Sequence, residues 1–179
     1  MGVSMEIAKE LDKAFREKDF SSKDSIIRLN SQGAYVFEWR AEDLTIKGEI
    51  LQEDSIGFML QSLMLEKNVE AEVTASYLQQ VALQIEQRVN YLQEPLKLIE
   101  LDSNASAVQM RSESPEVTEG TISYFEVLLK SGAWFGHRNR LTFHRYSSLP
   151  EREGERRTIA FPVTKRQLER LLDDLISVI

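Results

Sequence analysis

The chain has 179 residues, a formal net charge of −7, and 42% hydrophobic and 28% charged residues, which is typical of a globular domain. It contains no cysteine, which excludes a disulfide framework, a thiol nucleophile and a thiolate metal site. The acidic balance argues against a protein that coats nucleic acid non-specifically, because phosphate groups would repel it. The sequence shows neither a secretory signal pattern nor a run of 18 apolar residues, so we expect a cytoplasmic protein without a membrane-spanning segment.

The first half of the chain reads as a helix, several strands and a second helix. Ile7, Leu11 and Phe15 form an apolar stripe that predicts an amphipathic helix, which we expect to dock on its own domain or, as an alternative, on a partner chain. In the next clear strand, Tyr35, Phe37 and Trp39 share one face, and we expect them to pack in the core, with a stacking platform for bases as the alternative. The predicted elements are a helix at 6–15, strands at 25–30, 34–39, 44–51 and 69–73, and a long helix at 74–92.

Residues 54–65 are ambiguous between a helix and a buried strand. Ile56, Leu60 and Met64 fit one face of a helix, with Asp54 or Ser55 as the N-cap residue. The same segment alternates acceptably for a strand. The helix is the favoured interpretation.

The second half repeats the order of strands followed by a helix. Thr164 and Gln167 form the pattern of a capping box at the start of the last helix, and a leucine stripe follows them. The predicted elements are strands at 96–101, 106–111, 121–129, 138–146 and 156–161, polar loops at 112–120 and 147–155, and a helix at 164–178.

A short sequence pattern, VTxxxL, occurs at residues 73–78 and again at 163–168. At each place it opens a helix directly after a strand, where the threonine hydroxyl can accept a hydrogen bond from the first turn. In this repeated order the chain, over about residues 25–179, resembles the Whirly-type single-stranded-DNA-binding fold, a duplicated four-strand-plus-helix unit. The lysine- and glycine-rich strand motif of that family is absent, so no site residue is transferred from it. A saddle-shaped sheet like the TATA-box-binding fold, or a secretion-chaperone-like α/β sandwich, would give a similar element order.

The expected fold class is therefore α+β, with two tandem antiparallel sheet-plus-helix units and an extra N-terminal helix. We expect residues 1–179 to form a single compact domain. Within it, residues 1–20 hold the N-terminal helix, residues 21–94 the first unit and residues 95–179 the second.

The most distinctive segment is residues 132–146, GAWFGHRNRLTFHRY, which mixes aromatic rings with arginines and both histidines. Residues 130–170 hold ten Lys/Arg and four Asp/Glu, a local balance of +6, so the rest of the chain carries −13. Arginines beside aromatic rings suit stacked bases, phosphates or an acidic protein partner. Trp134 and Phe135 lie between two glycines, so they form either an exposed pair at a hairpin tip or part of the core.

Strand 138–146 predicts a polar, basic and aromatic face that holds Arg140, Thr142, His144 and Tyr146, opposite Leu141 and Phe143. As a binding face, it would hold phosphates with Arg140 and stack a base on Tyr146. The alternative is a solvated outer face, on which the arginines pair with neighbouring carboxylates such as Glu126. The expected binding residues are Trp134, Phe135, His137, Arg138, Arg140, His144, Tyr146, Arg156 and Arg157.

The two histidines, His137 and His144, are seven residues apart with no cysteine and no carboxylate at a zinc-binding spacing. The chain also lacks the GxGxxG and GxSxG patterns. We therefore expect no metal, no cofactor and no catalytic residue, and an enzyme that uses one histidine as acid or base is the outlying alternative.

Taken together, these features predict a non-enzymatic binding or regulatory protein. The leading hypothesis is single-stranded DNA or RNA binding through the basic–aromatic hairpin, in the manner of a transcriptional regulator. The alternative is an adaptor or assembly factor that uses the same residues for an acidic protein partner. A homo-oligomer is compatible with either function.

Overall fold

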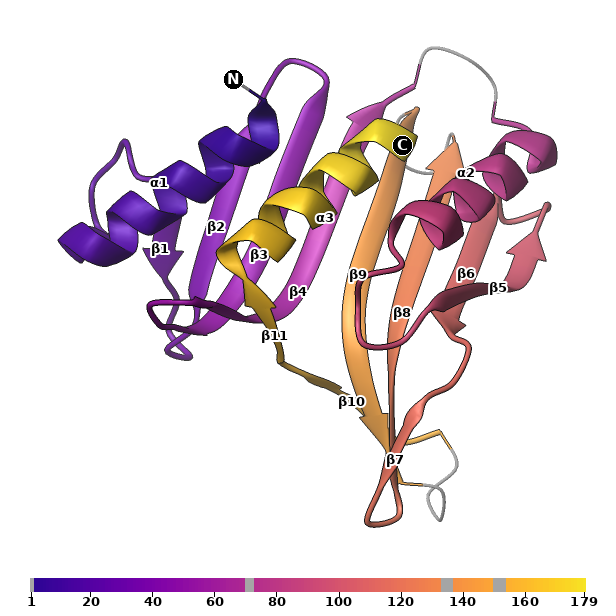
Figure 1. Ribbon diagram of the computed structural model, residues 1–179. Coiled ribbons are helices and arrows are strands. Elements are labelled where there is room, and N and C mark those ends of the chain that lie inside the picture. Colours follow the sequence, from indigo (N-terminus) through magenta and orange to yellow (C-terminus); the bar gives the residue numbers. More distant parts are fainter. Residues whose placement is uncertain (1, 70–72, 133–136, 150–153) are drawn as a thin grey trace.

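The computed structural model describes residues 2–69, 73–132, 137–149 and 154–179. It is an α+β structure with an N-terminal helix, as the sequence predicts (Figure 1). The elements in chain order are α1 (Val3–Glu17), β1 (Ile27–Leu29), β2 (Tyr35–Arg40), β3 (Leu44–Glu53), β4 (Gly57–Asn68), α2 (Ala75–Arg88), β5 (Leu96–Asp102), β6 (Ala107–Ser112), β7 (Glu116–Thr118), β8 (Thr121–Gly132), β9 (Arg138–Ser148), β10 (Arg156–Ile159), β11 (Phe161–Thr164) and α3 (Lys165–Val178).

The described strands form one antiparallel sheet of eleven strands, with the main order β1-β2-β3-β4-β9-β8-β6-β5. The last strand of the first half, β4, pairs with β9 of the second half, from Ser62 opposite His144 to Asn68 opposite Arg138. Beyond Ser62 and His144 the two strands part, and β9 continues with β10 while β4 continues with β11. The two halves therefore share a single sheet.

All three helices lie on the same face of this sheet (Figure 1). Helix α2 follows β4 in the chain but packs against β5 and β6 of the other half. Helix α3 follows β11 and packs against β4, with α1 beside it. The two units read from the sequence are therefore interleaved in space, because the helix of each unit covers strands of the other.

The apolar core lies between the helices and the sheet and includes side chains from both halves. Phe37 is fully buried, and Tyr35 and Trp39 pack at the edge of the core, as the strand pattern predicts. The Phe37 ring lies across Gly48 of β3, where a Cβ atom would come within 2.2 Å of the ring. Gly57 is similarly constrained, since a Cβ atom there would lie 2.0 Å from the Val163 carbonyl oxygen of β11.

The two VTxxxL segments begin α2 and α3 in the way the sequence predicts. Thr74 accepts a hydrogen bond from the Tyr77 amide, and Thr164 accepts one from the Gln167 amide, each at 3.1 Å. At α3 the Gln167 side chain also accepts from the Thr164 amide at 2.9 Å, which completes a capping box. The leucine four residues after each threonine is buried.

The helix expected at 54–65 is wrong, because this segment is strand β4. Pairing with β3 on one side and with β9 and β11 on the other stabilises an extended chain. Ile56, which the helix would bury, is 69% exposed at the turn before the strand. Asp54 still caps the local chain, but its carboxylate accepts from the amides of Ile56 and Gly57 in a β-turn and not in a helix.

Three smaller differences concern loops and strand ends. Loop 112–120 contains the short strand β7, which pairs with β8. The strand expected at 156–161 is divided at Ala160 into β10 and β11, which pair with different neighbours. For the strand expected at 69–73, Val69 and Val73 lie outside any strand, and residues 70–72 fall outside the described part.

We predict that Thr164→Ala lowers the free energy of unfolding by about 1 kcal/mol, because the first turn of α3 loses the hydroxyl acceptor of its capping box. Urea denaturation followed by circular dichroism measures the change. Thr164→Ser is the control and should stay close to the wild type, since it keeps the hydroxyl. An equal loss in both variants would contradict the role of the cap.

Candidate binding face on the uncovered side of the sheet

The candidate site lies on the face of the sheet opposite the three helices. In β9, Leu141 and Phe143 are buried toward the helices, whereas His144 and Tyr146 are half-buried on the opposite, uncovered face. The register then sets their neighbours, because His144 lies opposite Glu126 of β8 and Tyr146 lies opposite Tyr124. Seven residues from four strands meet here and are called the Glu126 cluster: Gln109, Arg111, Tyr124, Glu126, His144, Tyr146 and Arg156.

The centre of the cluster is the Glu126 carboxylate, of which one oxygen, Oε2, accepts three hydrogen bonds. The donors are Arg111 Nε at 2.8 Å, Arg156 Nη1 at 2.8 Å and Gln109 Nε2 at 2.9 Å. Burial alone would raise the pKa of the Glu126 carboxyl, but the hydrogen bonds from Arg156 and Arg111 outweigh it and hold this pKa below its usual value. Glu126 therefore stays ionised, and it is a poor proton acceptor.

Aromatic rings lie directly beside the two arginines. Arg156 Cζ is 4.0 Å from the centre of the Tyr146 ring, and Arg111 Cζ is 5.1 Å from that of Tyr124. The Tyr146 ring is in turn 6.0 Å from Tyr124 and 5.7 Å from His144, centre to centre. Burial lowers the pKa of His144, and Arg156 adds to this while Glu126 opposes it. His144 is therefore mostly neutral at pH 7.

A second group of charges lies further along β9, on the same face. Arg140 Nε donates to Glu66 Oε1 of β4 at 2.5 Å, and Arg138 Nη1 is 3.8 Å from Glu66 Oε2. Lys130 of β8 lies opposite Arg140 and is exposed. The arginines on this face are thus paired with carboxylates, as the solvated-face interpretation expects, while the excess of charge remains positive.

The remaining residues expected at the site lie elsewhere. His137 is exposed and precedes β9, and its backbone carbonyl oxygen accepts a hydrogen bond from the Val69 amide at 2.8 Å. It is on the order of 20 Å from His144 along an extended strand, so the two histidines are not brought together. Trp134 and Phe135 fall outside the described residues.

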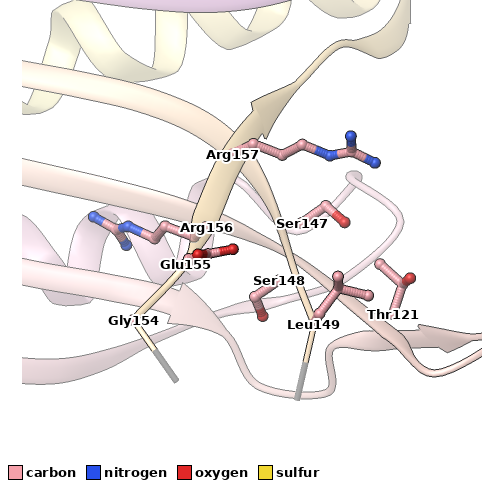
Figure 2. Close-up of a pocket in the computed structure, with 8 residues that line it drawn as sticks. All are labelled: Thr121, Ser147, Ser148, Leu149, Gly154, Glu155, Arg156 and Arg157. Carbon is pink, nitrogen blue, oxygen red and sulfur yellow. The ribbon is translucent and has the colours of Figure 1, made fainter. Parts of the chain in front are cut away.

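Arg157 is separated from Arg156 by the alternation of strand β10. Figure 2 shows the two guanidinium groups extending to opposite sides of this strand. Arg157 lines an open groove of about 530 Å³ with Thr121, Ser147, Ser148 and Leu149, and Arg156 also contributes to its lining. Its guanidinium group therefore extends away from the Glu126 cluster, although both arginines line this groove.

The arginine next to His144, Arg145, belongs to the helix side of the sheet. Its Nη2 donates to Glu94 Oε1 at 2.8 Å and to Glu116 Oε2 at 2.7 Å. Arg145 and Glu94 are both buried, and Ser112 also donates to Glu94. This network connects the segment after α2 to β6, β7 and β9, which makes Arg145 a structural residue.

Sequence reasoning missed Gln109, Arg111 and Tyr124 and considered Glu126 only as a neutralising partner. The available signal was the alternation in β8, which places Tyr124 and Glu126 on the face opposite Phe125 and Val127. Assigning partners to that face requires the order of strands, which the sequence does not give.

The described residues contain no group of three or more His, Cys, Asp or Glu that could hold a metal ion. No helix among them is long and apolar enough to cross a membrane. Comparison of this chain with protein-family models, curated proteins and solved structures gave no match.

We predict that Glu126→Gln lowers the free energy of unfolding by about 1–2 kcal/mol at pH 7, because two arginines lose their ionised partner. A carboxyl with a lowered pKa stabilises the fold above its unfolded-state value, 4.5, and this contribution disappears as the pH falls through the folded-state pKa. The difference between variant and wild type should therefore shrink below about pH 4.5. Urea denaturation at pH 7, 5 and 3.5 measures it.

Glu42→Gln provides the matched control for this experiment, since Glu42 is exposed in a turn. This variant should have a free energy of unfolding close to that of the wild type at all three pH values. If Glu126→Gln lowered the free energy of unfolding by the same amount at all three pH values, a role for the ionised carboxylate would be contradicted.

Proposed function

We propose that this chain is a non-enzymatic binding protein and that its uncovered sheet face binds single-stranded nucleic acid. The observation that carries the proposal is that neighbouring aromatic rings and cationic side chains meet on one sheet face, opposite all three helices (Figure 1). Sheets that bind single strands combine stacking rings with a basic surface in this way.

The charge of this face supports an anionic partner. On the uncovered side of β4, β6, β8, β9 and β10, five cationic side chains accompany two carboxylates, an excess of three positive charges in a chain of −7. The cations are Arg111, Lys130, Arg138, Arg140 and Arg156, and the carboxylates are Glu66 and Glu126. A positive centre of this face, on an acidic molecule, favours local binding and disfavours non-specific coating.

The rings favour a single strand over a duplex. Tyr124, Tyr146 and His144 are held by the sheet and by their neighbours, so they lose little freedom when a base stacks on them. Bases in a duplex already stack on each other and expose only their edges, whereas unpaired bases offer both faces. Each stacked base contributes about 1–3 kcal/mol.

A specific observation favours one other candidate, an acidic protein partner. The arginines are ordered by ion pairs and lie beside tyrosines, and Arg and Tyr are the residue types that dominate protein interfaces. The two functions differ in salt dependence, since each phosphate contact releases counterions and an interface centred on aromatic side chains does not.

The test is fluorescence anisotropy of labelled single-stranded DNA and RNA oligomers across a salt series. We expect binding that weakens steeply with salt, and we expect Lys130→Glu/Arg138→Glu to weaken it at least tenfold, because two favourable charges become repulsive. No binding of the wild type at low salt would overturn the proposal and leave the acidic protein partner as the function to examine.

Lys13→Glu/Lys23→Glu is the matched control, because it changes the net charge equally at two exposed positions outside the sheet. We expect it to retain nearly all of the affinity. A similar loss in both double variants would indicate an effect of overall charge and would contradict a specific face.

A further inference from the structure

Within the proposed face, Arg111 and Arg156 form an unusual pair. Both guanidinium groups converge on a single carboxylate oxygen, Glu126 Oε2, although they come from strands on either side of β8 and β9. Two positive charges and one negative charge leave the cluster with a net charge of +1 while His144 is neutral. Held this close, two like charges favour an additional anion between them.

Both arginines keep donors for such an anion. Arg111 contacts Glu126 through Nε, and Arg156 contacts it through Nη1, so these bonds use one of the five N–H groups of each guanidinium. The two side chains are 37% and 38% exposed, which leaves their outer edges accessible from solvent. The carboxylate and the tyrosine rings restrict how the guanidinium groups turn, which lowers the entropy cost of binding.

We propose that Arg111 and Arg156, oriented by Glu126, form a subsite for one phosphate group of the bound strand, and that a proton on His144 strengthens it. This inference rests on the proposed function and assigns the phosphate chemistry to one place on the face. Guanidinium groups suit a phosphate because they offer paired donors in a plane. Tyr124 and Tyr146 then lie where the adjacent bases of the strand would stack.

The charges around His144 determine the effect of its proton. The neighbours of His144 are Glu126 on β8, Arg156 on β10, Tyr146 on its own strand and Ser62 on β4. Arg111 lies beyond Glu126 on β6. Protonation would raise the net charge of the cluster from +1 to +2, because Glu126 stays ionised. Binding of an anion should therefore tighten as the pH falls, and it should in turn raise the pKa of His144.

The experiment compares Arg156→Met with Arg157→Met in the anisotropy titration. Both remove one positive charge from the same strand, but the two side chains extend to opposite sides of it (Figure 2). We expect Arg156→Met to weaken binding about fivefold to tenfold and to reduce the salt slope by about 0.7, the value for one lost phosphate contact on a single strand. Arg157→Met should bind like the wild type. Equal losses in the two variants would overturn the subsite.

A second measurement does not depend on the stability of an arginine variant. We expect the wild type to bind about threefold more tightly at pH 5.0 than at pH 7.5, and His144→Gln to lose this dependence. His137→Gln, which changes the other histidine, should retain it. Titration of the histidine NMR signals with and without the oligomer gives the pKa of His144 in the bound and free protein. An unchanged His144 pKa on binding would contradict the inference.

These outcomes separate the two proposals. A wild type that binds no oligomer at low salt and pH 7.5 contradicts the proposed function itself. If the wild type binds, two results contradict only the phosphate subsite. One is an equal affinity of Arg156→Met and Arg157→Met for the oligomer, and the other is a pH dependence that His144→Gln retains.

Discussion

The pairing of β4 with β9 is the contact on which the rest of the molecule depends. It joins one strand from each half, far apart in sequence, and it makes one sheet out of two sets of strands. The helices can cross to the opposite half only because that sheet is continuous. The same pairing places Glu66 of β4 beside Arg138 and Arg140 of β9, so the charge pattern of the uncovered face also follows from it.

Much of the fold could be predicted because its signals are local. The apolar stripes of the helices, the alternation in β2 and β9, and the threonine caps of α2 and α3 depend on residues within one or two turns of each other. The error at 54–65 shows the limit of this reasoning. Asp54 makes the hydrogen bonds of a helix cap, but it makes them in a turn, and pairing with strands on both sides decides between the two structures.

The candidate site was predictable only in part, for the same reason. Alternation along one strand places Arg140, His144 and Tyr146 on a common face without knowledge of the sheet. It cannot identify Arg111 as a neighbour of Glu126, since that contact depends on β6 lying beside β8. Alternation within the expected strand 156–161 also places Arg156 and Arg157 on opposite faces, but only the pairing of β10 with β9 shows which of the two lies beside Tyr146. The Whirly-type resemblance likewise stays a prediction.

The crossing of the helices has a consequence for synthesis on the ribosome. The inner surface of β4 is covered by α3, which follows all the described strands in the chain. During translation, the first half can form its hairpins and dock α1, yet most of the apolar side of β4, apart from Phe58 beside Phe15 of α1, has no cover until α3 has been synthesised. The nascent chain therefore carries an unprotected hydrophobic strip while β5 to β11 are being synthesised, the situation in which chaperones commonly assist. The order of elements along the chain thus delays completion of this layer until α3 has been synthesised.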